Sequence, residues 1–155
     1  MAEAFSNQVA RAAGIVTSYS GSTVAAGSTA ITVTALTGIG VSFLVDNQHF
    51  IAGTKVVATS AVSGGVGTVF TDRNSTNTAS ASSQTVKFLG PTTAYTSPAS
   101  TKSIIIGGTF ANNTNNSVNL TVEVYDTTVG VTSTGSAAIA SKIPVPSGSS
   151  FVISD

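Results

Sequence analysis

From Gly14 onward, short segments of alternating apolar and polar residues recur about every ten residues and are separated by Gly, Asn and Pro. The clearest segment begins at Val118, where apolar side chains alternate with polar ones as far as Tyr125. Successive side chains of a strand point to opposite faces, so this segment predicts a strand with one buried face. No apolar pattern with the period and length of an ordinary helix lies between the segments. The sequence therefore predicts an all-β fold of antiparallel sandwich or barrel-like modules rather than a parallel α/β sheet.

Other strands are expected where β-branched and apolar residues gather. In chain order these are residues 31–34, 41–45, 54–58, 66–71, 85–89, 92–96, 103–110, 137–145 and 151–153. The segment 103–110 contains three consecutive isoleucines and is expected to be a buried strand. Residues 72–84 are polar and rich in Ser, Thr and Asn, which predicts a loop. Residues 2–13 fit a helix of one or two turns and an extended arm equally well.

Charged residues make up 8% of the 155-residue chain, and six basic residues balance six acidic ones. A neutral chain lacks the basic field that binds nucleic acid or an anionic membrane surface, so neither partner is expected. The absence of cysteine excludes disulfides and thiolate metal sites. Few surface charges leave a free monomer with little protection against self-association, although Ser, Thr and Asn side chains can also keep such a surface soluble.

The N-terminal segment carries no export signal of the usual kind. Residues 1–14 have no apolar stretch after a basic start, so we expect no signal peptide. The longest apolar runs are a few residues, well below the roughly 20 that a membrane-spanning helix needs. We therefore expect the chain to fold in a cytoplasm and to be deployed by assembly rather than by export.

Residues able to carry catalysis or to bind a metal are few. His49 follows Asp46 near an Asn-Gln turn, and one histidine with one carboxylate falls short of a zinc ligand set. Glu123 and Asp126 lie close together, but glycoside hydrolysis also needs a groove with aromatic platforms, and the chain has no tryptophan. Calcium at Asp126 or in the 111–117 loop lacks a ligand cluster. We predict no enzyme activity, no catalytic or metal-binding residues and no cofactor, with His49 as a turn or surface residue.

Two further features have simple structural interpretations. The glycine-rich segments 38–40 and 64–67 lack the following helix and lysine of a phosphate-binding loop, so we interpret them as turns. Arg11, Lys102 and Lys142 are candidates for interface salt bridges, and the simpler interpretation is that each is an isolated surface cation.

Four motifs stand in order in the C-terminal half of the chain: TAYTSP at residues 93–98, SIIIG at 103–107, ANNT at 111–114 and IPVPSGSS at 143–150. Together with the alternating strand before the last motif, they make residues 92–153 resemble a β-sandwich module. This module is common among structural proteins of tailed bacteriophages, especially phages of aquatic bacteria, cyanobacterial phages included. The resemblance implies an antiparallel sandwich of immunoglobulin-like or jelly-roll-like type.

A second set of motifs lies between residues 29 and 90: ITVT at 31–34, GV at 40–41, IAGTKV at 51–56, VF at 69–70 and VKF at 86–88. These residues resemble a second, small β module that occurs in tail and particle proteins of phages. The corner of that module usually contains a proline, which residues 50–53 lack.

The resemblance also predicts how the segments are organised. In the family, a strand similar to residues 8–18 leads directly into the strand with the TAYTSP motif, and the sandwich continues past the position of Ile153. We therefore expect residues 1–19 to pack with a sandwich of residues 91–155, and residues 20–90 to form an inserted β module. The competing hypothesis is two sequential domains, with the open sheet edge after Ile153 paired to a neighbouring subunit.

By resemblance, the chain would be a non-enzymatic structural component of a virion, at the neck, the tail or the capsid surface, assembled in the host cytoplasm. Its partners would be copies of itself and other virion proteins, joined by symmetric interfaces of sheet edges and apolar patches. We expect contacts at residues 1–13, at the 72–84 loop and at residues 151–155. The alternative is a receptor- or glycan-binding module of a tail fibre or tail tip, which would need exposed tyrosines clustered on one surface, drawn from Tyr19, Tyr95 and Tyr125. An ice-binding surface would need a regular threonine array, and the threonine spacing is irregular.

Overall fold

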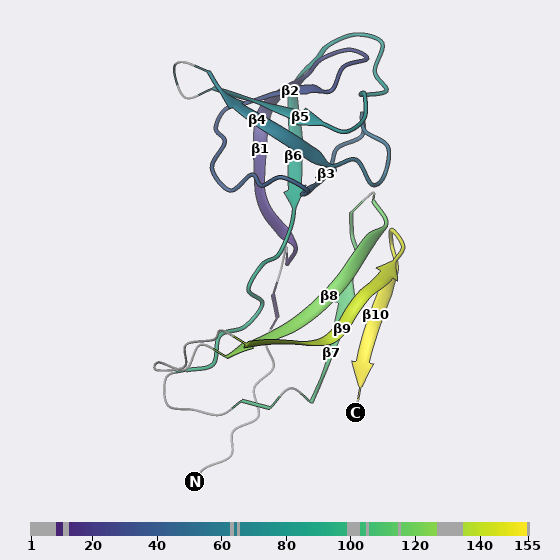
Figure 1. Ribbon diagram of the computed structural model, residues 1–155. Helices are drawn as coiled ribbons and strands as arrows, with labels where there is room; N and C mark the ends of the chain where they lie inside the picture. Colours follow the sequence, from purple (N-terminus) through teal and green to yellow (C-terminus); the bar gives the residue numbers. More distant parts are fainter. Residues whose placement is uncertain are drawn as a thin grey trace. The chain divides into compact units, whose positions relative to one another are not determined.

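The computed structural model describes residues 9–10, 13–62, 64, 66–98, 103–104, 106–114, 116–126 and 135–154. These residues form ten β-strands and no helix (Figure 1). Every strand pair is antiparallel, so the prediction of an all-β antiparallel fold is confirmed. The chain divides into two compact units, Met1–Ile105 and Ile106–Asp155, called here the first and the second unit.

The first unit is a curled six-stranded sheet in the order β3-β6-β1-β2-β5-β4. Its strands are β1 (Ile15–Val24), β2 (Ala30–Val33), β3 (Leu44–Asp46), β4 (Val56–Ala61), β5 (Gly67–Thr71) and β6 (Ala81–Leu89). The two terminal strands meet where Leu44 bridges Lys55, and Val56 N–H donates to the carbonyl of Phe43 at 2.9 Å. The sheet therefore closes on itself at the beginning of β4.

The core of the first unit lies inside this curled sheet. Nine apolar residues are buried there, contributed by strands and by one turn: Val24, Ile31, Val33, Val45, Phe50, Val56, Val69, Val86 and Phe88. Alternation explains the arrangement, because on β2 Ile31 and Val33 face the interior while Thr32 is exposed. The residues between Val33 and β3 add Leu36, Ile39 and Phe43, which pack against the cluster.

The second unit contains β7 (Gly107–Ala111), β8 (Val118–Asp126), β9 (Gly135–Val145) and β10 (Ser150–Ser154). These strands pair as two separate two-stranded sheets, β7 with β10 and β8 with β9 (Figure 1). Residues 112–117 connect β7 to β8, and residues 146–149 connect β9 to β10. Both connections therefore lead from one sheet to the other.

Several boundaries differ from the sequence-based expectation. The loop after β5 ends at residue 80 rather than 84, because Ala81 already pairs with Val24 of β1. Residues 92–96 form no strand, and residues 91–98 are exposed throughout. The strand expected at 103–110 begins only at Gly107, which pairs with Ser154, the last residue of β10. Ile104 and Ile106 precede this paired segment and are exposed instead of buried, at 87% and 61%.

The expected module boundaries also differ from the units of the structure. The boundary between residues 19 and 20 falls inside β1, in which Tyr19 pairs with Val86 of β6. Residues 15–19 therefore belong to the six-stranded sheet, and this sheet is larger than the small inserted module that was expected. The boundary at residues 90 and 91 also moves, since residues 91–105 belong to the first unit. The expected packing of residues 1–19 on the C-terminal segment stays a prediction.

Candidate assembly surfaces

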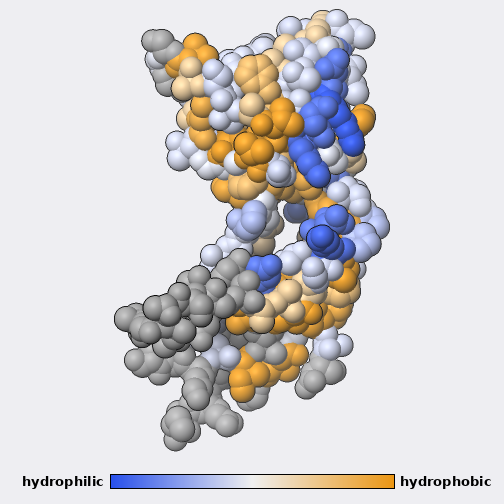
Figure 2. All heavy atoms as spheres, in the orientation of Figure 1, coloured by the Kyte–Doolittle hydropathy of each residue, from blue (hydrophilic) through white to orange (hydrophobic). Residues whose placement is uncertain are grey.

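Apolar side chains reach the surface of both units (Figure 2). In the second unit, Val124 on β8, Ile139 on β9 and Val152 on β10 are all more than two-fifths exposed, at 44%, 48% and 57%. Among the described side chains of this unit, only Val145 is a buried apolar residue. The strands of the second unit therefore leave much of their apolar surface uncovered by their own chain.

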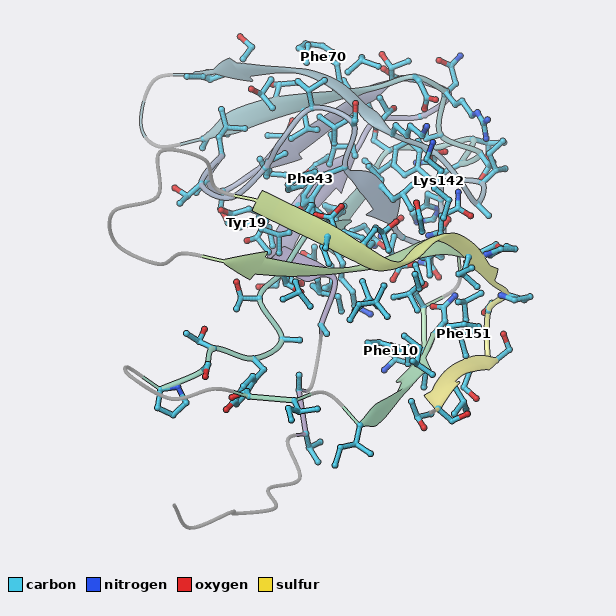
Figure 3. All side chains as sticks on the ribbon, turned by 60° about the horizontal axis from the view of Figure 1, so that its bottom comes forward. Tyr19, Phe43, Phe70, Phe110, Lys142 and Phe151 are labelled. Carbon is cyan, nitrogen blue, oxygen red and sulfur yellow. The ribbon has the colours of Figure 1, made fainter. Side chains whose placement is uncertain are left out.

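The inner faces of the two small sheets are only half buried. Phe110 of β7 and Phe151 of β10 are directly paired across their sheet, as Figure 3 shows, and both are of intermediate exposure. On the other sheet, Leu120 pairs with Ile143 and is likewise half-buried. A two-stranded sheet is marginally stable unless further strands or another layer cover it. The second unit thus has the composition of a sandwich but little enclosed core among its described residues.

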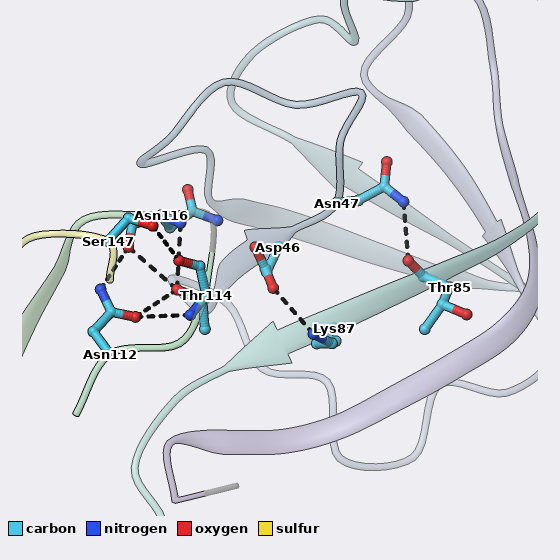
Figure 4. Close-up of polar contacts among 8 residues, drawn as sticks. All are labelled: Asp46, Asn47, Thr85, Lys87, Asn112, Thr114, Asn116 and Ser147. Atoms are coloured by element: carbon cyan, nitrogen blue, oxygen red, sulfur yellow. Dashed lines mark hydrogen bonds and ion pairs between the residues drawn. The ribbon is translucent and has the colours of Figure 1, made fainter. Parts of the chain in front are cut away.

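A polar corner, made of Asn112, Thr114, Asn116 and the 146–149 turn, holds the two connections of the second unit together (Figure 4). The side-chain amide of Asn112 donates to the carbonyls of Asn116 and Val145, at 2.7 and 2.9 Å. Its Oδ1 accepts from the N–H and the hydroxyl of Thr114, at 3.0 and 2.8 Å. Two donors and two lone pairs are all that an asparagine amide offers, so every position is occupied.

The main chain completes the polar corner. Asn112 N–H donates to the carbonyl of Ser149 at 2.8 Å, and Gly148 N–H donates to the carbonyl of Asn112 at 2.9 Å. The Ser147 hydroxyl donates to the carbonyl of Thr114 at 2.6 Å. The ANNT and PSGS motifs therefore build one hydrogen-bonded structural element, in which Asn112 and Thr114 are buried. Nothing local in the sequence shows that the two motifs meet.

In the 111–117 loop, Asn112 Oδ1 is engaged by the N–H and the hydroxyl of Thr114. Within the part of the chain that the structure describes, no three His, Asp or Glu side chains gather into a metal-binding cluster. The described residues also contain no helix that is long and apolar enough to span a membrane.

His49 lies in a turn and is of intermediate exposure, in agreement with its interpretation as a turn residue. Its N–H donates to Asn47 Oδ1 at 2.9 Å, and its ring lies 3.3 Å from the Gln48 side-chain nitrogen. Asp46 faces a different partner, because β3 pairs with β6 and places Lys87 directly opposite, with Lys87 Nζ 3.6 Å from the carboxylate. Asp46 and Lys87 therefore form an ion pair across the sheet.

The loop after β5, expected to be a contact segment, is fastened to the first unit. Ser75 N–H donates to the carbonyl of Ser28 at 2.8 Å, and the Ser75 hydroxyl donates to the carbonyl of Ala25 at 2.6 Å. Thr76 N–H donates to the carbonyl of His49 at 2.8 Å. Three connections thus meet at one end of the curled sheet. Most side chains of residues 72–80 are nevertheless exposed. The segment is therefore an exposed loop whose backbone is held by hydrogen bonds.

The remaining candidate residues are dispersed. Tyr19 packs edge-on against Phe88, with ring centroids 6.5 Å apart, and its hydroxyl donates to the carbonyl of Thr37 at 2.6 Å. Tyr95 is exposed, and its hydroxyl lies 3.2 Å from that of Ser103. The side chain of Tyr125 lies outside the described residues. Tyr19 is therefore a half-buried residue that packs against the core of the first unit.

Of the charged candidates, Lys142 is exposed on β9, where it has a φ of 52° and donates its N–H to Thr121 Oγ1 at 3.1 Å. Glu123 is exposed on β8. Arg11, Lys102 and the side chain of Asp126 lie outside the described residues. The contact segment 1–13 is described only at residues 9, 10 and 13, where Val9 is largely exposed, at 81%.

The hairpin of β4 and β5 is a surface that sequence reasoning did not single out. All residues of β4 after Val56 are exposed. Three valines are among the exposed apolar residues of the hairpin, Val57 on β4 and Val62 and Val66 in the turn that follows. A signal was present in the sequence, because residues 56–71 contain neither a charged residue nor a proline.

No family model matches the sequence, and no curated protein or solved structure shows significant similarity to it. The resemblance to phage particle modules therefore rests on the motifs themselves.

Proposed function

We propose that this protein is a non-enzymatic structural subunit of a particle and that it acts by associating with copies of itself and with other particle proteins. The resemblance of its motifs to modules of tailed-phage proteins supports a virion as this particle. The neck, the tail and the capsid surface are the proposed locations. The chain would be assembled there through symmetric interfaces.

The observation that carries this proposal is the uncovered apolar surface of the second unit. Val152, Ile139 and Val124 are exposed on three of its four strands, and the two sheets enclose few side chains of their own. We take these side chains to be parts of interaction surfaces, because removing apolar surface from water favours association. In a particle, neighbouring subunits would cover this apolar surface permanently.

Charge supports the same proposal. The chain has a net charge of zero with 8% charged residues, so repulsion between copies is weak at any orientation. A two-fold symmetric interface places the same surface of both subunits face to face. When that surface is uncharged, no like charges are brought together.

The direct test is the native mass of the purified protein across a concentration series, measured by sedimentation or native mass spectrometry. We expect one discrete closed oligomer, which would also reveal the symmetry axis that the subunit occupies. A strict monomer at every concentration would contradict self-assembly. Replacement of Val152 by Asp should weaken the oligomer, whereas the same replacement at Val41, exposed in the first unit, serves as the matched control.

A further inference from the structure

We infer that β4 is the strand through which two copies of this chain pair edge to edge. The inference deepens the proposed assembly function and rests on it, since it names one contact and its partner. It is carried by the first unit alone and makes no use of the apolar surfaces of the second unit.

The position of β4 in the sheet provides the geometry. β4 is the last strand in the sheet order and pairs with β5 along its length. At the opposite edge, β3 reaches only the beginning of β4, through Val56 and the bridge from Leu44 to Lys55. Residues 57–61 extend past this closure and are exposed on both faces. The hairpin therefore projects beyond the closed part of the sheet.

The direction of the main-chain groups follows from the register. Val62 N–H donates to the carbonyl of Val66 at 2.9 Å, so the main-chain groups of residue 62 face β5. Hydrogen-bonding direction alternates along an antiparallel strand, and Ser60 is the next residue that faces β5. Thr59 and Ala61 consequently direct their N–H and C=O groups away from β5. These groups form a ready template for another strand.

This edge carries none of the usual devices against pairing. Natural edge strands are protected by charges, especially lysine, and by proline. In the second unit, β9 shows both, with Lys142 and Pro144. In contrast, residues 56–71 of the hairpin contain no charge and no proline, and β4 consists of Val, Ala, Thr and Ser. An uncharged strand of this composition at an open edge is prone to pair with another strand.

The occupant that fits this edge is a second copy of the chain. Two-fold antiparallel pairing sets β4 against β4, and in every register an uncharged residue then faces an uncharged residue. A charged partner would find no counter-charge along this edge. Each copy would supply the donors and acceptors that the other needs, because the same strand presents both.

The test compares two identical substitutions at exposed threonines. Thr59→Lys introduces a charge on the terminal strand, and Thr32→Lys introduces the same charge on β2, an inner strand. Two lysines brought close together by β4 pairing repel each other, so the dissociation constant of the oligomer should rise at least about tenfold for Thr59→Lys and stay near wild type for Thr32→Lys. Circular dichroism and thermal unfolding verify that both variants fold.

A second variant tests the hydrogen bonds directly. Thr59→Pro removes an N–H that points away from β5, so it should leave the hairpin ladder intact while blocking an added strand. Loss of association in Thr59→Lys and Thr59→Pro, but not in Thr32→Lys, supports the inference. A wild-type oligomer that both Thr59 variants leave intact overturns this inference alone. A wild-type chain that is monomeric at every concentration overturns the proposed function and the inference together.

Discussion

Nine apolar side chains are buried inside the curled sheet of the first unit, whereas Val145 is the one buried apolar residue among the described side chains of the second unit. The two units contain similar strands, with alternating β-branched residues and turn residues between them. They differ in closure. Six strands curl until their first and last members meet, while four strands remain as two separate pairs.

This difference shows that similar strand patterns can be stabilised in two ways, by an enclosed apolar core or by polar contacts together with a covering partner. Burial of one Val, Ile or Phe side chain contributes about 1.5–3 kcal/mol, so the enclosed cluster of the first unit can support it without a partner. The second unit depends more on its polar corner, where one buried asparagine amide is fully hydrogen-bonded. Its half-buried apolar faces gain stability when another subunit covers them.

The largest effect should separate the two kinds of core. Phe88 is fully buried in the first unit, so Phe88→Ala should reduce the free energy of unfolding by about 3–5 kcal/mol. Phe110→Ala in the second unit should cost clearly less, because the ring is already partly in water. Denaturant unfolding combined with amide hydrogen exchange reports on each unit separately. Equal losses of unfolding free energy for Phe88→Ala and Phe110→Ala would show that the two units have equally well enclosed cores.

A medium effect is expected at the polar corner. Asn112→Asp replaces two donated hydrogen bonds with a carboxylate oxygen that faces the carbonyls of Asn116 and Val145, at a cost of about 1–3 kcal/mol. The neighbouring Asn113 is exposed, so Asn113→Asp is a matched control and should be close to neutral. The measurement is the exchange protection of amides in β7 to β10. If both variants behave alike, the polar corner contributes little to the second unit.

The smallest effect concerns the 146–149 turn. Gly148 has a φ of 72° in this turn, and a Cβ atom added there would meet nothing within 4 Å. Gly148→Ala should therefore cost only the backbone strain of a left-handed conformation, about 1–2 kcal/mol. Gly148→Asn should cost less, because asparagine tolerates this conformation. Thermal unfolding of the two variants is the check, and a larger loss for Asn than for Ala would argue against this account of the turn.

Much of the strand pattern was predictable because it is local. Alternation around Ile31 and from Val118 onward identified β2 and β8, and turn residues bounded β5 and β10. Pairing was not predictable in the same way. The isoleucines around residue 105 have the composition of a buried strand, yet Ile104 and Ile106 lie before the first paired residue, Gly107, and are exposed.

The candidate surfaces were less accessible to sequence reasoning than the fold. The contact segments were chosen from their composition, and the 72–80 loop proved to be bonded to neighbouring connections. The β4 edge and the polar corner around Asn112 were not chosen, although the uncharged run 56–71 and the ANNT motif were visible. An edge or a corner is defined by what lies beside it, and this is a property of the folded chain.

The sequence by itself determined the all-β class, the antiparallel strands and most of the turns, because alternation and turn chemistry act between residues that are close along the chain. The tertiary structure alone decided that the first sheet closes at Leu44 and Lys55 and that Asn112 holds two distant connections together. It also decided which apolar residues remain in water. Burial and pairing depend on neighbours that are remote in sequence, and only the folded chain brings those neighbours into contact.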